Sequence, residues 1–305
     1  MSTAQGRQTA LDVVVRSKAR IGEGPIWDAR SGSLRWVDIL AGHIYRTDIT
    51  SGTSTRRDLP TIVGAIAPTS QGDLVVACKE GFGRLSEEGS FEVLLSFLSP
   101  VHRMNDAKCD AAGRFWAGST AVRPTVGEGA LHMLSPGWTS KVVQEDLGLP
   151  NGIAWSPGGD KMYLADSLLR LLSVFDFDQD SGTVSSRRTL LEFPSGMGTP
   201  DGLSADTAGC LWVAMWGGAC VVRISPNGEL DRSIPVPVRQ PTSCAFGGPG
   251  MDVIFITSAR EGLDLPETSL DGSVFALSGS GQRGTSQPPF ATPSELSPPE
   301  VLPPP

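Results

Sequence analysis

The sequence predicts an all-β fold, a six-bladed β-propeller with four antiparallel strands in each blade. Apolar residues come in short runs with a period near two, the pattern of β-strands. No stretch has the long 3.6-residue periodicity of an amphipathic helix. A strand-rich unit also recurs six times along the 305 residues. Radial repetition of four-stranded units is the signature of a propeller.

The six units begin at regular intervals of 40 to 50 residues. Each opens with a short apolar strand that runs into a turn rich in Gly, Ser, Pro and Asp, and a second strand such as "LRWVDI" or "KMYLADS" follows. The third strand resembles "HIYRTD" and the fourth resembles "SSRRTLLEF". The first strands are expected to start near Glu23, Val63, Asn105, Asn151, Asp201 and Thr242.

One domain, residues 11–281, accounts for the whole propeller, after a flexible N-terminus at residues 1–10. The segment "LDVVVRSKAR" at 11–20 precedes the first unit and is expected to supply the outer strand of the last blade. Such a strand closes the ring and covers an otherwise unpaired edge. Residues 282–305 are rich in Pro and Ser, and we expect this tail to be largely disordered because proline cannot donate to a strand ladder.

Composition excludes several classes of protein. The net charge of −8 argues against a nucleic-acid partner, which requires a basic surface. No apolar run is long enough to span a membrane, and "MSTAQGRQTALDVVV" has no signal-peptide core, so we expect a cytoplasmic protein with no membrane partner. The five cysteines form no C-x-x-C pair and are expected to be small buried thiols. The oligomeric state is left open.

Oxygen-bearing side chains recur at the starting position of the unit. In a propeller the first strand of each blade lies beside the central channel, so Glu23, Asn105, Asn151 and Asp201 are expected to share one axis. A buried carboxylate is costly unless it is paired or bound to metal. We therefore expect one divalent cation in the channel, with calcium, magnesium, manganese, zinc and ferrous iron as candidates. The alternative is that Asn-Gly and Asp-Gly are ordinary turn signals.

A second pair lies beside this ring. Arg103 and Asn105 are two residues apart and point to one face of a strand, where they suit hydrogen bonding to a small polar ligand. A salt bridge from Arg103 to an acid at the rim is the alternative. Asp106 is expected to face away from the axis and bond neighbouring backbone, and Asp166 is interpreted as a structural carboxylate, with a supporting role in the site left open.

Five motifs in order closely resemble the regucalcin/senescence-marker-protein/gluconolactonase family: "GEGPIWD", "RMNDAKCDAAGRFWAGS", "LPNGIAWSPGGDKMYLADS", "TPDGLSADTAGCLWVAMWGG" and "PTSCAFGG". The resemblance covers residues 11–280. It implies a six-bladed propeller with one metal in its channel, held by Glu23, Asn151 and Asp201. It also implies substrate contacts from Arg103 and Asn105, and hydrolysis of sugar lactones. Other family members are described as calcium-binding proteins.

The chain departs from the family at "AGSTAVRP", where Arg123 stands in place of a substrate-binding glutamate. Arg123 is therefore a candidate contact to an anionic or differently decorated lactone. The hypothesis is a divalent-metal-dependent, gluconolactonase-like enzyme that uses a metal-polarised carbonyl and a metal-bound water. Asp201 is the candidate general base, with Glu23 as the alternative. The rival functions are a calcium-binding regulatory protein without catalysis and a related propeller esterase or phosphotriesterase.

Overall fold

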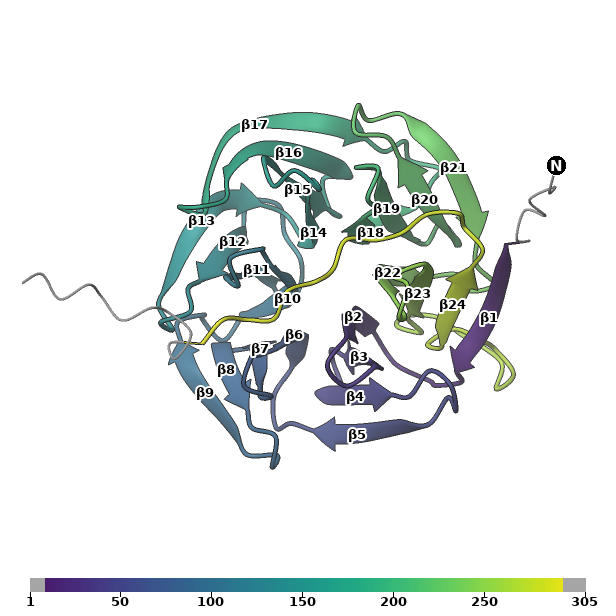
Figure 1. Ribbon diagram of the computed structural model, residues 1–305, viewed down its shortest axis with the longest axis horizontal. Coiled ribbons are helices and arrows are strands. Elements are labelled where there is room, and N and C mark those ends of the chain that lie inside the picture. The colour runs from purple at the N-terminus through teal and green to yellow at the C-terminus, as the bar shows by residue number, and fades with distance from the viewer. Residues whose placement is uncertain (1–8, 293–305) are drawn as a thin grey trace, which may run out of the picture.

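The computed structural model describes residues 9–292, and within this range it contains 24 β-strands and no helix. The strands form six four-stranded antiparallel sheets arranged radially, which confirms the predicted six-bladed propeller (Figure 1). None of the described residues forms a helix long and apolar enough to cross a membrane.

In five of the six sheets the four strands are consecutive in the sequence, and in the sixth sheet β1 follows β24. Blades 1 to 3, from innermost to outermost strand, are β2 (Gly22–Asp28), β3 (Ser33–Asp38), β4 (His43–Thr47) and β5 (Ser54–Asp58); β6 (Val63–Pro68), β7 (Leu74–Cys78), β8 (Gly81–Leu85) and β9 (Phe91–Ser96); and β10 (His102–Cys109), β11 (Phe115–Ala121), β12 (Gly129–Leu134) and β13 (Ser140–Leu147).

Blades 4 to 6 follow the same order. They are β14 (Pro150–Trp155), β15 (Lys161–Asp166), β16 (Leu171–Asp178) and β17 (Thr183–Glu192); β18 (Thr199–Ala205), β19 (Leu211–Trp216), β20 (Cys220–Ile224) and β21 (Leu230–Pro235); and β22 (Pro241–Gly247), β23 (Val253–Ser258), β24 (Val274–Ser278) and β1 (Ala10–Val15).

The N-terminal strand closes the ring. β1 pairs antiparallel with β24, from Ala10 opposite Ser278 to Val15 opposite Val274. The last blade therefore combines strands from both ends of the propeller, as the sequence predicted. Closure hides the edge of β24, which would otherwise offer unpaired backbone groups to another chain.

An aspartate at the end of the inner strand organises the following turn in at least two blades. The carboxylate of Asp110 accepts bonds from the backbone amides of Ala112 and Arg114, and from the indole of Trp116 at 2.9 Å. Asp206 bonds the Trp212 indole in the same way, at 3.1 Å. These bonds satisfy buried indole N–H groups, which allows both tryptophans to enter the core.

The core is divided among the spaces between blades. Trp36, Trp116 and Trp212 are completely buried there, which confirms their interpretation as core residues. All five cysteines are free; four are buried, and Cys220 is half-buried. Burial of such large apolar side chains stabilises the fold by about 25 cal/mol for each Å² removed from water.

Residues 282–292, here called the C-terminal strap, cross one face of the ring (Figure 1). Thr207 donates to the carbonyl of Arg283, and Phe290 donates to that of Pro68, so the strap is attached to blades 5 and 2. The Phe290 side chain is fully buried between blades 2 and 3. This part of the expected disordered tail thus packs on the propeller. Residues 293–305, which carry the rest of that prediction, lie outside the described residues.

Candidate metal and substrate site

A β-bulge interrupts the inner strand of every blade at the position where the sequence placed the ring of oxygen-bearing side chains. The pairing register shifts between Glu23 and Ile26, between Met104 and Ala107, between Pro150 and Ile153, and between Pro200 and Leu203, with equivalent shifts in β6 and β22. A bulge leaves a residue out of the ladder and re-aims its side chain. Glu23, Asn105, Asn151 and Asp201 therefore all lie at or within irregular backbone.

These bulges open onto a cavity of about 420 Å³ at one end of the channel, here called the site cavity. Glu23, Asn151 and Asp201, the three predicted metal ligands, all line it, and so do Arg103 and Asn105. Five residues from four blades thus meet in one space. Each is at least nine-tenths buried.

Two of the three predicted ligands have an oxygen with no hydrogen-bond partner. Asn151 Oδ1 and Asp201 Oδ1 are both buried and unpartnered. The Asn151 amide nitrogen donates to Ser167 Oγ at 3.1 Å, which leaves Oδ1 as the free atom. Buried unpaired oxygens are costly, and a hard divalent cation accepts carboxylate and carboxamide oxygens as ligands. The donor set present therefore fits such a cation.

Among the described residues, no His or Cys side chain lines the site cavity. Within residues 9–292, no group of three or more His, Cys, Asp and Glu side chains is arranged to hold a metal. Glu23 and Asp201 supply two acids, and the third candidate ligand is an amide. This all-oxygen set favours calcium, magnesium or manganese over metals that prefer histidine or thiolate.

Carboxylates in the channel raise one another's proton affinity. Burial, with help from the charge of Asp106, raises the pKa of Glu23 to about 8. Burial and the charges of Glu23 and Asp106 hold the pKa of Asp201 well above its usual range. Arg103 and the partly buried Lys108 are the cations that act on these acids. Three acids against two bases leave the channel with an excess of negative charge when all are ionised, and a divalent cation would offset it.

Asp106 bonds neighbouring backbone and affects the site acids through its charge. Its carboxylate accepts a bond from the Ala107 amide at 2.7 Å, as expected for backbone bonding. Its charge raises the pKa values of Glu23 and Asp201, but Asp106 does not line the site cavity.

Arg103 and Asn105 form a direct pair. Arg103 Nη1 donates to Asn105 Oδ1 at 2.7 Å and to the Met104 carbonyl at 2.9 Å. Asn105 Nδ2 donates to the Pro150 carbonyl at 3.1 Å. Among the described residues Arg103 makes no ion pair with a rim acid, and its Nε and Nη2 donate to no protein acceptor. These two nitrogens are available to a ligand in the cavity.

Arg123 and Asp166 occupy different surroundings. Arg123 is exposed in the loop after β11; its neighbours Val122 and Pro124 line the site cavity, but Arg123 does not. Asp166 accepts bonds from the Gly148 and Leu149 amides at 2.7 and 3.0 Å. It therefore shapes the loop before β14, as in the structural interpretation of this residue.

Half of the cavity lining is apolar, a feature the sequence did not reveal. The eight apolar residues, here called the apolar wall, come from loops and strand ends of several blades: Ile21, Ile39, Leu40, Val122, Pro124, Leu149, Leu168 and Trp216. Ser167, Thr199 and Glu261 complete the lining. The sequence repeat could have indicated the apolar wall, since most of its residues flank the start of an inner strand or the end of a second strand.

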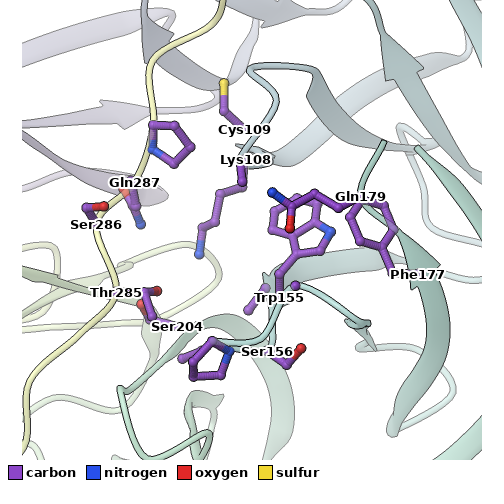
Figure 2. Close-up of a pocket in the computed structure, with 16 residues that line it drawn as sticks. Lys108, Cys109, Trp155, Ser156, Phe177, Gln179, Ser204, Thr285, Ser286 and Gln287 are labelled. Carbon is purple, nitrogen blue, oxygen red and sulfur yellow. The ribbon is translucent and has the colours of Figure 1, made fainter. Parts of the chain in front are cut away.

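A second cavity of about 360 Å³, here called the strap cavity, lies at the other ends of the inner strands. It is lined by Lys108, Trp155 and Ser204, and it is covered by strap residues including Thr285 and Gln287. Figure 2 shows the Lys108 side chain extending into the space between the strap and Trp155. No predicted metal ligand or substrate contact lines this cavity.

Relatives share both the sequence and the fold over almost the whole chain. A 6-deoxy-6-sulfogluconolactonase of Pseudomonas putida is 35% identical over 274 residues, 87% of this chain and 94% of that protein. Regucalcin of Gallus gallus is 32% identical over 296 residues, 92% of this chain and 98% of that protein.

Solved structures of similar proteins have the same fold. A luciferin-regenerating enzyme, 28% identical, superposes with a TM-score of 0.87 and covers 93% of this chain and 99% of its own. Regucalcin from Agrobacterium tumefaciens, described as a calcium-binding protein, is 27% identical and superposes with a TM-score of 0.86, covering 92% and 97%. The family model described as the SMP-30/Gluconolactonase/LRE-like region matches residues 21–260. The chain therefore belongs to the SMP-30/gluconolactonase/LRE-like family.

Proposed function

We propose that this protein is a divalent-metal-dependent lactonase that opens a lactone ring to the hydroxy acid. The observation that carries the proposal is the pair of unpartnered buried oxygens, Asn151 Oδ1 and Asp201 Oδ1, in one cavity with Glu23. The relatives' names point to sugar lactones as the substrate class, and glucono-δ-lactone is the reference substrate.

The cation would be held by Glu23, Asn151 and Asp201. When bound, it supplies Lewis acidity, which polarises the ester carbonyl and lowers the pKa of water. Arg103 Nε and Nη2 donate to oxygen atoms of the substrate and fix its orientation. Asn105 holds the guanidinium through its own Oδ1, so the two residues act as one positioning unit.

Asp201 is proposed to act as the general base, with Glu23 as the alternative. A base removes a proton from the attacking water as oxygen adds to the carbonyl carbon. The ring C–O bond then breaks, and the released alkoxide takes up a proton to give the hydroxy acid. Without metal, burial raises the pKa of Glu23 and of Asp201, and a bound cation would lower both and favour the ionised form that accepts a proton.

Removal and return of the metal test this proposal. The protein is dialysed against chelator, its metal content is measured, and calcium, magnesium, manganese, zinc and ferrous ion are added back separately. We expect hydrolysis of glucono-δ-lactone above the spontaneous rate to disappear with the metal and to return with at least one ion. Full activity in a preparation shown to be metal-free would contradict the proposal.

The second candidate is a calcium-binding protein without catalysis, which the regucalcin relatives favour. It uses the same three ligands. Tight calcium binding measured by calorimetry, combined with no hydrolysis of any lactone with any of the five ions, would support this candidate over the lactonase.

A further inference from the structure

The polar groups of the site cavity are already largely committed to protein partners. Eight polar residues line it, and three of them are the proposed metal ligands. Of the other five, Asn105 uses both ends of its amide, and Ser167 both donates to the Pro200 carbonyl at 2.6 Å and accepts from Asn151. Little hydrogen-bonding capacity remains for a ligand.

Glu261 is also occupied. Its two carboxylate oxygens each accept a bond from Arg20, both at 3.1 Å. Among the side chains that line the cavity, this leaves Arg103, through Nε and Nη2, and the hydroxyl of Thr199 as groups without a protein partner. Arg103 Nε and Nη2 and the Thr199 hydroxyl offer four donor hydrogens and one acceptor oxygen, part of which the ester group uses, whereas a gluconolactone carries four hydroxyl groups that each donate and accept.

Apolar side chains occupy the rest of the surface. The apolar wall supplies half of the lining residues. Two of its members are also exposed at the mouth, Val122 at 46% and Leu168 at 40%. Val101 and Val126, exposed at 63% and 58%, lie close by: the Val122 amide bonds the Val101 carbonyl, and Val126 is in the same loop as Val122. Two of the seven large apolar side chains exposed in the described residues, Val122 and Leu168, thus line the site cavity, and Val101 and Val126 lie in adjoining backbone.

We infer that the substrate is a lactone whose ring carries an apolar substituent, an alkyl or aryl group that packs on the apolar wall, rather than a polyhydroxylated sugar ring. This inference rests on the proposed lactonase function and refines its substrate class. The physical reason is that an apolar wall gains free energy from an apolar substituent, whereas a hydroxyl buried there loses its bonds to water without replacement.

A matched pair of six-membered lactones tests the inference. δ-Octalactone carries a propyl group, and glucono-δ-lactone carries hydroxyl groups and a hydroxymethyl group. With the activating metal present, we expect kcat/KM for δ-octalactone to be roughly 100-fold the higher, the size of discrimination that an apolar pocket achieves. The spontaneous hydrolysis rate of each lactone is subtracted.

Substitutions at the wall localise the effect. Leu168→Ser and Val122→Ser, made singly at partly exposed positions, are expected to lower kcat/KM for δ-octalactone roughly 10-fold and to leave that for glucono-δ-lactone the same or higher. Leu230→Ser is the matched control, since Leu230 is 51% exposed but lies on the outer strand β21. It is expected to leave both values unchanged.

The other outcomes separate the inference from the function beneath it. Preference for glucono-δ-lactone would overturn the inference of an apolar substituent but would still support the proposed lactonase function. Preference for 6-deoxy-6-sulfogluconolactone that is lost in Arg123→Gln would overturn it in favour of an anionic substrate. No hydrolysis of any lactone with any of the five ions would overturn the proposed function and the inference together.

Discussion

The two ends of the propeller channel are built from the same six inner strands and differ in chemistry. At the start of the strands the site cavity contains Glu23 and Asp201, two buried acids with raised pKa values. At their ends the strap cavity is lined by a base, Lys108, and by no acid. Its unpartnered polar atoms are the Trp155 indole nitrogen and both ends of the Gln287 amide, so its described residues offer one free carboxamide oxygen and no carboxylate.

Repetition of the fold does not by itself create a metal or substrate site. Both cavities are lined in part by the inner strands of blades 3, 4 and 5, and they have similar volumes, about 420 and 360 Å³. Only the site cavity has bulges that turn oxygen-bearing side chains inward, and only the strap cavity is covered by chain from outside the repeat. We therefore expect residues of the site cavity to contribute to catalysis and residues of the strap to contribute to the stability of the fold.

The largest expected difference in activity is between substitutions at two residues of one strand. Asp201→Asn keeps the size of the side chain but removes the charge and the proposed base, so lactone hydrolysis is expected to fall at least ~1000-fold and metal affinity to fall with it. Ser204→Ala, three residues along β18 at the strap cavity, is expected to change kcat/KM less than about 3-fold. Steady-state kinetics and calorimetric metal titration measure both.

Equal losses in the two variants would remove the distinction between the two ends. Full activity of Asp201→Asn would instead show that the general base and the ligand set have been assigned to the wrong residue.

The strap is expected to contribute to the stability of the fold and not to catalysis. Phe290 is completely buried between blades 2 and 3 and meets Trp138 edge-on, with 5.3 Å between ring centroids. Phe290→Ala is expected to lower the free energy of unfolding by about 3–5 kcal/mol and to leave kcat at room temperature nearly unchanged. Phe97→Ala, at an aromatic residue that is 42% exposed, is the matched control and is expected to cost roughly 1 kcal/mol or less.

Denaturant titration followed by a fluorescence probe gives both unfolding free energies. If Phe290→Ala inactivated a protein that was still fully folded, the strap would have a catalytic role and the proposed division between the two ends would fail.

A smaller difference concerns pH. In the folded metal-free protein the pKa of Glu23 is about 8, against an ordinary value of 4.5. Between these values the folded chain holds more protons than the unfolded one, so the free energy of unfolding decreases as pH rises from about 5 to about 8. One pKa unit corresponds to about 1.4 kcal/mol, so the decrease is on the order of a few kcal/mol. Bound metal should flatten this dependence, because it stabilises the ionised carboxylate.

Melting temperatures recorded across this pH range, with and without metal, check the expectation. Glu23→Gln is expected to reduce the slope of the metal-free protein, whereas Ser204→Ala at the other end is expected to preserve it. A metal-free melting temperature that rises with pH in the same way in all three proteins would contradict the raised pKa of Glu23.

The sequence by itself determined the repeat and therefore the ring. Six regularly spaced strand units imply six blades, and equivalent positions of a radial repeat must approach one axis. For this reason the convergence of Glu23, Asn151 and Asp201 on one cavity could be predicted from residues up to 178 positions apart. The closing role of β1 was predicted from its place before the first unit, because an open ring would leave an unpaired strand edge.

Only the tertiary structure decided what surrounds that axis. The bulges of the inner strands depend on strand register, which one strand's sequence does not specify. The apolar wall is assembled from loops of different blades, and the strap is placed by the burial of Phe290 between two of them and by backbone hydrogen bonds to blades 2 and 5. Both depend on contacts between distant segments, and side chains meet in such contacts only after the ring has closed.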